Sequence, residues 1–282
     1  MAVAFVFVVP LAWMIAGSLR PTGLPPARGI EWLPWPPAWD NYRRIFEILP
    51  LARYALNSLI VAGLAVPLTV VSASWAGLGM ALAGRRWRQR WIGLAIGLLL
   101  VPPAALWLPR FVLFTWLHLT DSFAALLAPA LLGSSPLFVL LFYWSFRRVP
   151  EDVFDSARLD GAGPLALWRR VALPLAGPAV AAVAILAFWL YWGDFLGPLL
   201  YLKSERLYTL PIGVRQLQQM ARSNWPLLLA AAMVMTAPPM ALFVAGQRYL
   251  LGEVWGRSKG DKGSKGEGRK TKDGGRMNGG RG

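Results

Sequence analysis

Six long apolar segments run through this chain and leave little freedom in what it can fold into. A helix needs about 20 mostly apolar residues to cross the hydrocarbon core of a bilayer, and each segment meets or approaches that length. An open strand would leave backbone groups unsatisfied in lipid, and no alternating barrel pattern is visible. The sequence therefore predicts an all-α integral membrane protein with six transmembrane helices. The predicted spans are about 2–18, 57–82, 91–109, 123–145, 175–201 and 225–250.

Composition supports a membrane protein and argues against several other classes. Hydrophobic residues make up 56% of the chain and charged residues 15%, whereas soluble domains carry about a quarter charged residues. The formal charge of +15 does not indicate nucleic-acid binding, because the basic residues lie in loops that flank the spans. Cysteine is absent and the single histidine, His118, falls in an expected loop. The chain therefore has no thiolate site and no histidine cluster for a metal.

Lysine and arginine predict the orientation. The segments 84–90, 146–174 and the tail from residue 248 would share one side of the membrane, and they hold four, five and ten of the 29 basic residues. The positive-inside rule assigns them, and both termini, to the cytoplasm. The first apolar run has no preceding basic region, which favours an uncleaved span over a signal peptide. We expect residues 1–256 to form the transmembrane domain and the Gly- and Lys-rich tail over 257–282 to be disordered.

Several predicted spans contain proline, which removes a backbone donor and kinks a helix. Such breaks suit a transporter whose helices move. Proline is also simply commoner in membrane helices than in soluble ones. The sequence leaves both interpretations open.

A polar stretch interrupts the apolar pattern between the fourth and fifth predicted spans. Glu151 and Asp152 fall in an expected first helical turn, where acidic residues suit the helix dipole. Gly161 is a suitable stop, since glycine readily takes the left-handed cap conformation, and Pro164 is a suitable start for a second helix. The stretch therefore predicts two short helices at the cytoplasmic face. The first is able to lie flat and present a surface to another protein.

The residues of this stretch resemble a known motif. Asp155-Ser156-Ala157, three residues, Gly161, nine residues, Val171, one residue and Leu173-Pro174 resemble the EAA loop of bacterial ABC importer permeases, which reads E-A-A, three residues, G, nine residues, I, one residue, L-P. In that family the loop forms a coupling helix that sits in a cleft of the ATP-binding subunit. The resemblance implies an EAA coupling loop over 146–174 and the type I ABC importer permease fold. The residues that it assigns to ATPase coupling are Asp155, Ser156, Ala157, Asp160, Gly161, Leu173 and Pro174.

Weaker matches are similar to carbohydrate permeases of the maltose-transporter type, and to the maltose permease G component in particular. They include 157–162, 192–199, 207–213 and the pairs Asn41-Tyr42 and Asn57-Ser58. The resemblance implies a transport subunit, not an enzyme, in a bacterial or archaeal inner membrane. Its implied partners are a second permease subunit, forming a heterodimer, two ATP-binding cassette subunits and an extracytoplasmic sugar-binding protein. ATP would bind to the ATPase subunits, and no cofactor to this chain.

Three residues near the end of the fifth predicted span are candidates for the translocation path. Asp194 is an ionisable residue at membrane depth, which is a functional candidate by default. The alternative is a carboxylate at a helix end that already reaches water. Trp189 and Trp192 are candidates for stacking on sugar faces, or they belong to an interfacial aromatic belt.

Other functions weigh less. A membrane-embedded enzyme needs a nucleophile and base, or a metal cluster, at membrane depth, and the chain offers few such groups. A glycine pattern at 161–166 superficially fits a dinucleotide fingerprint but follows no predicted strand. A non-transporting scaffold does not account for the EAA spacing. An ABC permease for another solute, such as glycerol phosphate, a polyamine or a peptide, shares that loop and remains the alternative.

Overall fold

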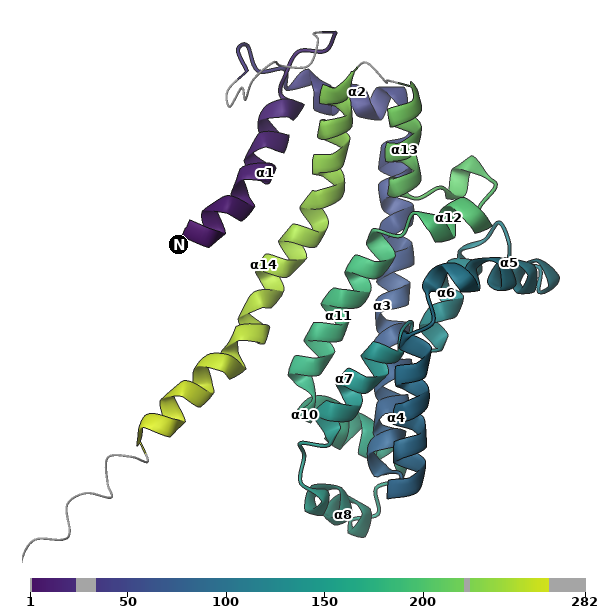
Figure 1. Ribbon diagram of the computed structural model, residues 1–282, viewed down its shortest axis with the longest axis vertical. Coiled ribbons are helices and arrows are strands. Elements are labelled where there is room, and N and C mark those ends of the chain that lie inside the picture. The colour runs from purple at the N-terminus through teal and green to yellow at the C-terminus, as the bar shows by residue number, and fades with distance from the viewer. Residues whose placement is uncertain (1, 24–33, 221–223, 264–282) are drawn as a thin grey trace, which may run out of the picture.

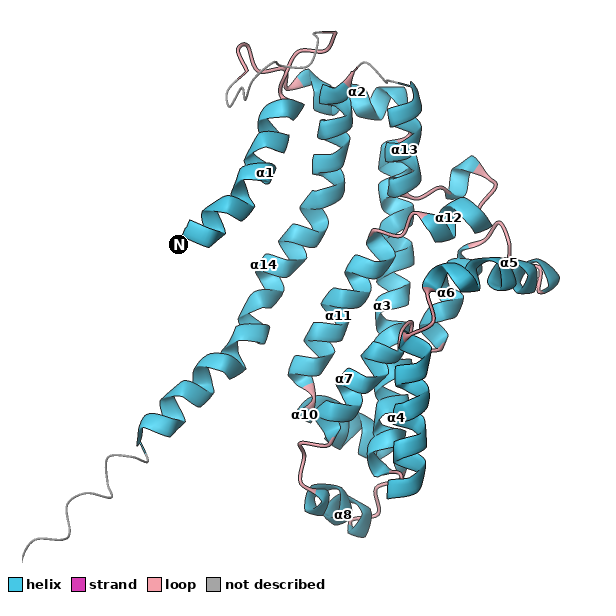
Figure 2. Cartoon of the chain, in the orientation of Figure 1, coloured by secondary structure: helices cyan, strands magenta, loops and turns pink. Residues whose placement is uncertain are grey.

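The computed structural model describes residues 2–23, 34–220 and 224–263, and every regular element among them is helical (Figure 2). The last predicted span lies within the final helix, which continues to Gly263, past the expected start of the tail. The rest of the expected tail, 264–282, lies outside the described residues. The α-helices are α1 (Ala2–Ser18), α2 (Asp40–Ile48), α3 (Leu51–Leu82), α4 (Arg85–Leu99), α5 (Trp107–Trp116), α6 (Phe123–Leu131), α7 (Pro136–Phe146), α8 (Glu151–Leu159), α9 (Pro164–Ala166), α10 (Leu173–Leu175), α11 (Gly177–Trp192), α12 (Leu196–Tyr201), α13 (Leu210–Met220) and α14 (Trp225–Gly263). Three short helices of other types are η1 (Pro103–Leu106), the π-helix η2 (Leu167–Ala172) and η3 (Glu205–Leu207).

Helices α3, α4, α7 and α11 form a bundle (Figure 1). Helix α1 packs on α14 at one side, and α14 also contacts α11, α2 and α13. Helices α2 and α13 lie at one end of the bundle and α8 lies at the opposite end (Figure 1). The two ends of the membrane-spanning part are therefore built from different sequence segments, and α3 runs between them.

By length and composition, three helices of the described chain are long and apolar enough to cross a membrane: α3, α6 with α7 taken as one, and the Trp225–Gly246 part of α14. Two bent helix pairs raise the number to five. Helix α1 coincides with the first predicted span and is 17 residues long. At most 39% of the apolar window of any of the three helices is buried, so most of this apolar surface faces outward.

The third predicted span, 91–109, is not one straight helix. It is divided into α4 and the η1–α5 segment, which meet at an angle of 93°. Pro102 and Pro103 follow the end of α4, and because proline has no N–H and its ring crowds the preceding turn, they favour a break in the helix at this point. The fourth predicted span is also interrupted, at residues 132–135 between α6 and α7.

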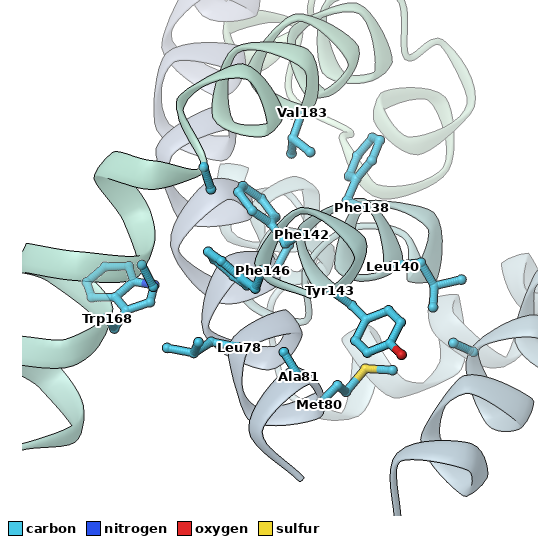
Figure 3. Close-up of a cluster of buried hydrophobic side chains, with 14 of the residues drawn as sticks. Leu78, Met80, Ala81, Phe138, Leu140, Phe142, Tyr143, Phe146, Trp168 and Val183 are labelled. Atoms are coloured by element: carbon cyan, nitrogen blue, oxygen red, sulfur yellow. The ribbon is translucent and has the colours of Figure 1, made fainter. Parts of the chain in front are cut away.

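The core of the bundle is built around α7. Phe142 and Phe146 are fully buried and stack with ring centroids 5.9 Å apart (Figure 3). They pack against Leu78 of α3, Trp168 of η2 and Val183 of α11. The close approach of α3 and α7 depends on Gly77, because a Cβ built there would lie 2.7 Å from Cβ of Phe142 and 2.9 Å from the backbone nitrogen of Tyr143.

Candidate functional site

Helix α8 forms the exposed end of the bundle, and local signals define both of its ends. Glu151 and Asp152 occupy its first turn, where negative charge interacts favourably with the helix dipole. At its end Gly161 has a φ of +82°. The N–H of Ala162 donates to the carbonyl of Ala157 and the N–H of Gly161 to that of Arg158, both at 3.0 Å. This is the Schellman arrangement, which satisfies the last carbonyls of the helix and reverses the chain.

One side of α8 holds it to the bundle and the other is open to solvent. Phe154 is only 3% exposed and belongs to the core cluster around Phe142, while Ala157 packs against the same cluster. Asp155, Ser156 and Asp160 are exposed. The polar residues of the motif therefore form an exposed surface, and Phe154 together with Ala157 holds the helix that carries them.

Two exposed ion pairs involve residues of this helix. Arg147 donates to Glu151 at 2.8 Å, and Arg158 donates to Asp155 at 2.8 Å. Asp155 is 63% exposed as a side chain, and pairs of this kind contribute about 0–1 kcal/mol. Asp155 is therefore available to exchange this partner for another charged group.

The segment after Gly161 leads back into the membrane through a rigid connection. The indole Nε1 of Trp168 donates to Oγ of Ser74 on α3 at 3.0 Å, and its ring meets Trp75 edge-on at 5.3 Å. The π-helix η2 directly precedes α10, which contains Pro174, a residue without an N–H. The chain then bends by 86° into α11. The loop is thus joined to α3 by packing and to α11 by the chain itself.

The structure divides the predicted coupling residues into two groups. Those from Asp155 to Gly161 lie on or directly after α8, at the free end of the bundle. Leu173 is half-buried against the core cluster, and Pro174 is exposed in α10, where the chain turns toward the membrane. The first group offers a surface, and the second shapes the return of the chain.

The three candidates for the translocation path are not brought together as one site. Trp189 is 67% exposed on α11. Trp192 is 2% exposed, donates through Nε1 to the carbonyl of Met235 at 2.8 Å and stacks on Phe188. Trp192 therefore ties α11 to α14. Asp194 follows the end of α11 and accepts the N–H of Gly197 at 3.1 Å, in the first turn of α12.

Sequence reasoning missed a chain of hydroxyl groups inside the bundle. The hydroxyl of Ser134 lies within hydrogen-bond distance of Thr69 on α3 and of Tyr191 on α11. Ser134 has a φ of +57° and Gly133 a φ of +78°, so this polar group sits where the backbone between α6 and α7 is irregular. A sequence signal exists: Gly-Ser-Ser-Pro at 133–136 interrupts an otherwise apolar run.

At the end of the bundle opposite α8, side chains of α3 hold the segment that leads into α13. Asn57 donates to the carbonyls of Arg206 and Tyr208, both at 2.9 Å, and Ser58 accepts the N–H of Leu210 at 2.9 Å. Both ends of α3 are thus connected to loops, one through Asn57 and Ser58 and the other through Ser74.

Asp121 forms a second clasp at this end. Its carboxylate accepts the hydroxyl and the N–H of Ser204 and the N–H of Lys203. These hydrogen bonds favour the ionised form and lower the pKa of Asp121 from 3.8 to about 2, with the Ser204 hydroxyl as the largest cause. In the described part of the chain, no group of three or more His, Cys, Asp or Glu side chains gathers as a metal site would require.

Comparison with known proteins agrees with this architecture. Residues 50–251 match the family model described as "Binding-protein-dependent transport system inner membrane component". The arabinooligosaccharides transport system permease protein AraQ of Halalkalibacterium halodurans is 32% identical over 252 residues, covering 88% of this chain and 90% of that protein. The sulfoquinovosyl glycerol transport system permease protein SmoH of Agrobacterium fabrum is 31% identical over 252 residues, covering 89% and 88%.

The fold is also that of a solved transporter. A bacterial ABC transporter involved in the import of the acidic polysaccharide alginate superposes with a TM-score of 0.69 at 17% identity, over 86% of this chain and 90% of that one. The loop geometry, the family match and the relatives lead to one conclusion. The chain belongs to the family of inner membrane components of binding-protein-dependent transport systems.

Proposed function

We propose that this chain is a membrane-spanning subunit of an ATP-driven importer of sugars. The observation that carries the proposal is the build of α8: Phe154 and the Gly161 cap fix it to the bundle, while Asp155 and Ser156 face away from it. When another subunit docked on a helix held in this way moves, the helix moves with it and displaces α3 and α11. The named sugar and glycoside systems of its relatives support the substrate class.

In the proposed assembly, α8 docks on one of two ATP-binding subunits at the cytoplasmic side. A second permease subunit completes the membrane part, and an extracytoplasmic binding protein delivers the sugar at the end of α2 and α13. Both termini then lie in the cytoplasm, and α14 runs toward the α8 end of the bundle, as this orientation requires (Figure 1). ATP binds to the partner subunits and affects the conformation of this chain only through contacts on α8.

ATP must favour one conformation of the permease over the other for transport to occur. A ligand with equal affinity for both states shifts nothing, and a nearly complete switch requires a difference of about 5.5 kcal/mol. The connection through Trp168 and Ser74 carries this difference into the bundle. If α8 were less firmly attached to the bundle, it would still bind the ATPase, but its movement would no longer displace the membrane helices.

The test compares valine at two neighbouring glycines. Gly161 has a φ of +82°, which a β-branched residue tolerates poorly, whereas Gly163 has a φ of −68° and nothing within 4 Å of an added Cβ. With the assembled transporter in proteoliposomes, Gly161→Val should lower sugar uptake per ATP hydrolysed, because the left-handed conformation costs about 1–2 kcal/mol. Gly163→Val should leave that ratio unchanged. Unchanged coupling in Gly161→Val would refute the assigned role of α8.

The substrate class has its own test. The binding protein that works with this permease should be stabilised in a thermal-shift screen by members of a sugar panel. Stabilisation by amino acids, peptides, polyamines or glycerol phosphate instead of sugars would overturn the substrate class and leave the coupling role intact.

A further inference from the structure

An open cleft lies between the start of α4 and α8, and arginine side chains dominate its lining. Its volume is about 230 Å³, and residues of α3, α4, α7 and α8 line it. Arg85 and Arg88 come from α4, Arg147 from the end of α7 and Arg158 from α8. Segments that are up to about 70 residues apart thus direct guanidinium groups to one place.

The charges in the cleft do not balance. Glu151 and Asp155 also line it, and they pair with Arg147 and Arg158. The lining holds no third acidic residue for Arg85 and Arg88. The cleft therefore carries an excess of positive charge, and guanidinium groups bind phosphate oxygens through paired hydrogen bonds.

The cleft lies at the boundary of the membrane. Leu82, the last residue of α3, is part of its lining. On α4, the exposed Trp87 and Trp91 mark the interfacial level, since tryptophan is enriched there. Farther along the same helix, Leu94 and Leu98 are half-exposed at 50% and 51%. A phospholipid fits this order of surfaces, with its headgroup at the arginines and its acyl chains along α4.

We propose that this cleft binds the phosphate headgroup of an anionic membrane lipid. Basic pockets at the cytoplasmic end of transmembrane helices are suited to such headgroups. An acidic protein segment would satisfy the charge but would make no use of the apolar surface that continues along α4. Because α4 and α8 both contribute arginines, a bound headgroup links the bundle to α8. The site shares Asp155 with the exposed motif, whereas Arg85 and Arg88 lie outside that motif, and its existence does not depend on the transported solute.

The test uses the full-length chain in a non-ionic detergent and short-chain lipids as probes. Dioctanoyl phosphatidylglycerol should bind, and dioctanoyl phosphatidylcholine should bind much more weakly, as measured by microscale thermophoresis. Arg85→Gln with Arg88→Gln should weaken phosphatidylglycerol binding about tenfold or more. The matched control is Arg86→Gln with Arg90→Gln, which removes the same charge from the same helix outside the cleft lining. It should change the affinity less than about twofold, and thermal unfolding should be alike in both variants.

Several results would overturn the proposal. Equal losses in the two double variants would mean diffuse attraction to basic residues and no defined site. Equal affinity for phosphatidylcholine would remove the role of the anionic headgroup. Inorganic phosphate binding as tightly as the lipid would make the cleft a site for soluble anions. Complete displacement of the lipid by the ATP-binding subunit would show that an acidic protein surface fills the cleft.

Discussion

Single polar side chains hold the non-helical segments of this protein in place. Asn57 donates to two carbonyls of the segment before α13, and Asn41 donates to the carbonyls of Ser18 and Arg20 at 2.8 Å. Asp121 accepts from Ser204 and Lys203. Buried or half-buried backbone groups without partners are costly, so each of these side chains replaces hydrogen bonds that a helix would otherwise supply.

The Asp121 clasp gives a pH dependence whose direction follows from its pKa. The folded-state pKa is about 2, below the ordinary value of 3.8, so the clasp is fully formed above about pH 4 and is lost as the pH falls through about 2. Hydrogen exchange at the Ser204 amide, corrected for the intrinsic rate, measures this directly. Protection should stay constant from about pH 7 to pH 4 and fall below about pH 3. Loss of protection already near pH 5 would contradict the assignment.

At the scale of whole helices, α3 organises the bundle. It contacts α7, α11 and α6 along its length, and the loop segments at both of its ends are bonded to it. Its packing on α7 leaves no room for a side chain at Gly77. Gly79, two residues farther along the same helix, has nothing within 4 Å of an added Cβ. Substitutions at these two glycines therefore distinguish the effect of crowding between α3 and α7 from the effect of alanine on helix propensity.

Gly77→Ala should destabilise the protein by about 1–3 kcal/mol, because the neighbouring atoms include backbone that cannot move aside. Gly79→Ala adds the same methyl group to the same helix and should be neutral or slightly stabilising. Thermal unfolding in detergent micelles checks both. Similar melting temperatures for the two variants would mean that α3 and α7 are not packed as closely as described.

The connection of the segment after α8 to α3 also has an energetic test. Trp168→Phe and Ser74→Ala each remove the same hydrogen bond, so their effects should not add. A double-mutant cycle on unfolding should give a coupling energy of about 1 kcal/mol. A coupling energy near zero would show that the indole and the hydroxyl do not depend on each other.

At the scale of the whole molecule, the two ends of the bundle should face different compartments. The chain contains no cysteine, so a single introduced cysteine is the only thiol to label. Ser156→Cys on α8 and Gln219→Cys on α13 place exposed thiols at opposite ends. In spheroplasts, whose cytoplasmic membrane is intact, an impermeant maleimide should label the Gln219 variant. It should label the Ser156 variant only after lysis. The reverse pattern would invert the orientation.

The sequence predicted the helical class and the bounds of α1, because a long apolar run in lipid has only one regular solution. It also predicted where α8 begins and ends, since Glu151, Gly161 and Pro164 act through their nearest neighbours. It did not predict the break between α6 and α7 or the bend after α4. A proline in a membrane helix is either accommodated or breaks the helix, and the outcome depends on neighbouring helices that local rules do not see.

The same limit explains the residues near the end of α11. Trp189 and Trp192 look alike in the sequence, yet one is exposed and the other is bonded to the carbonyl of Met235. Which tryptophan is buried depends on the position of α14, more than 30 residues farther along the chain. The hydroxyl chain through Ser134 was missed for a related reason, because Thr69 and Tyr191 meet it only in the folded bundle.

Helix α3 has 32 residues and therefore spans about 48 Å, well beyond the roughly 30 Å thickness of the hydrocarbon core. One continuous rod thus passes through the membrane with a loop fastened near each end. Any displacement that α3 passes from one face to the other travels through the turn around Pro67, the proline inside this helix.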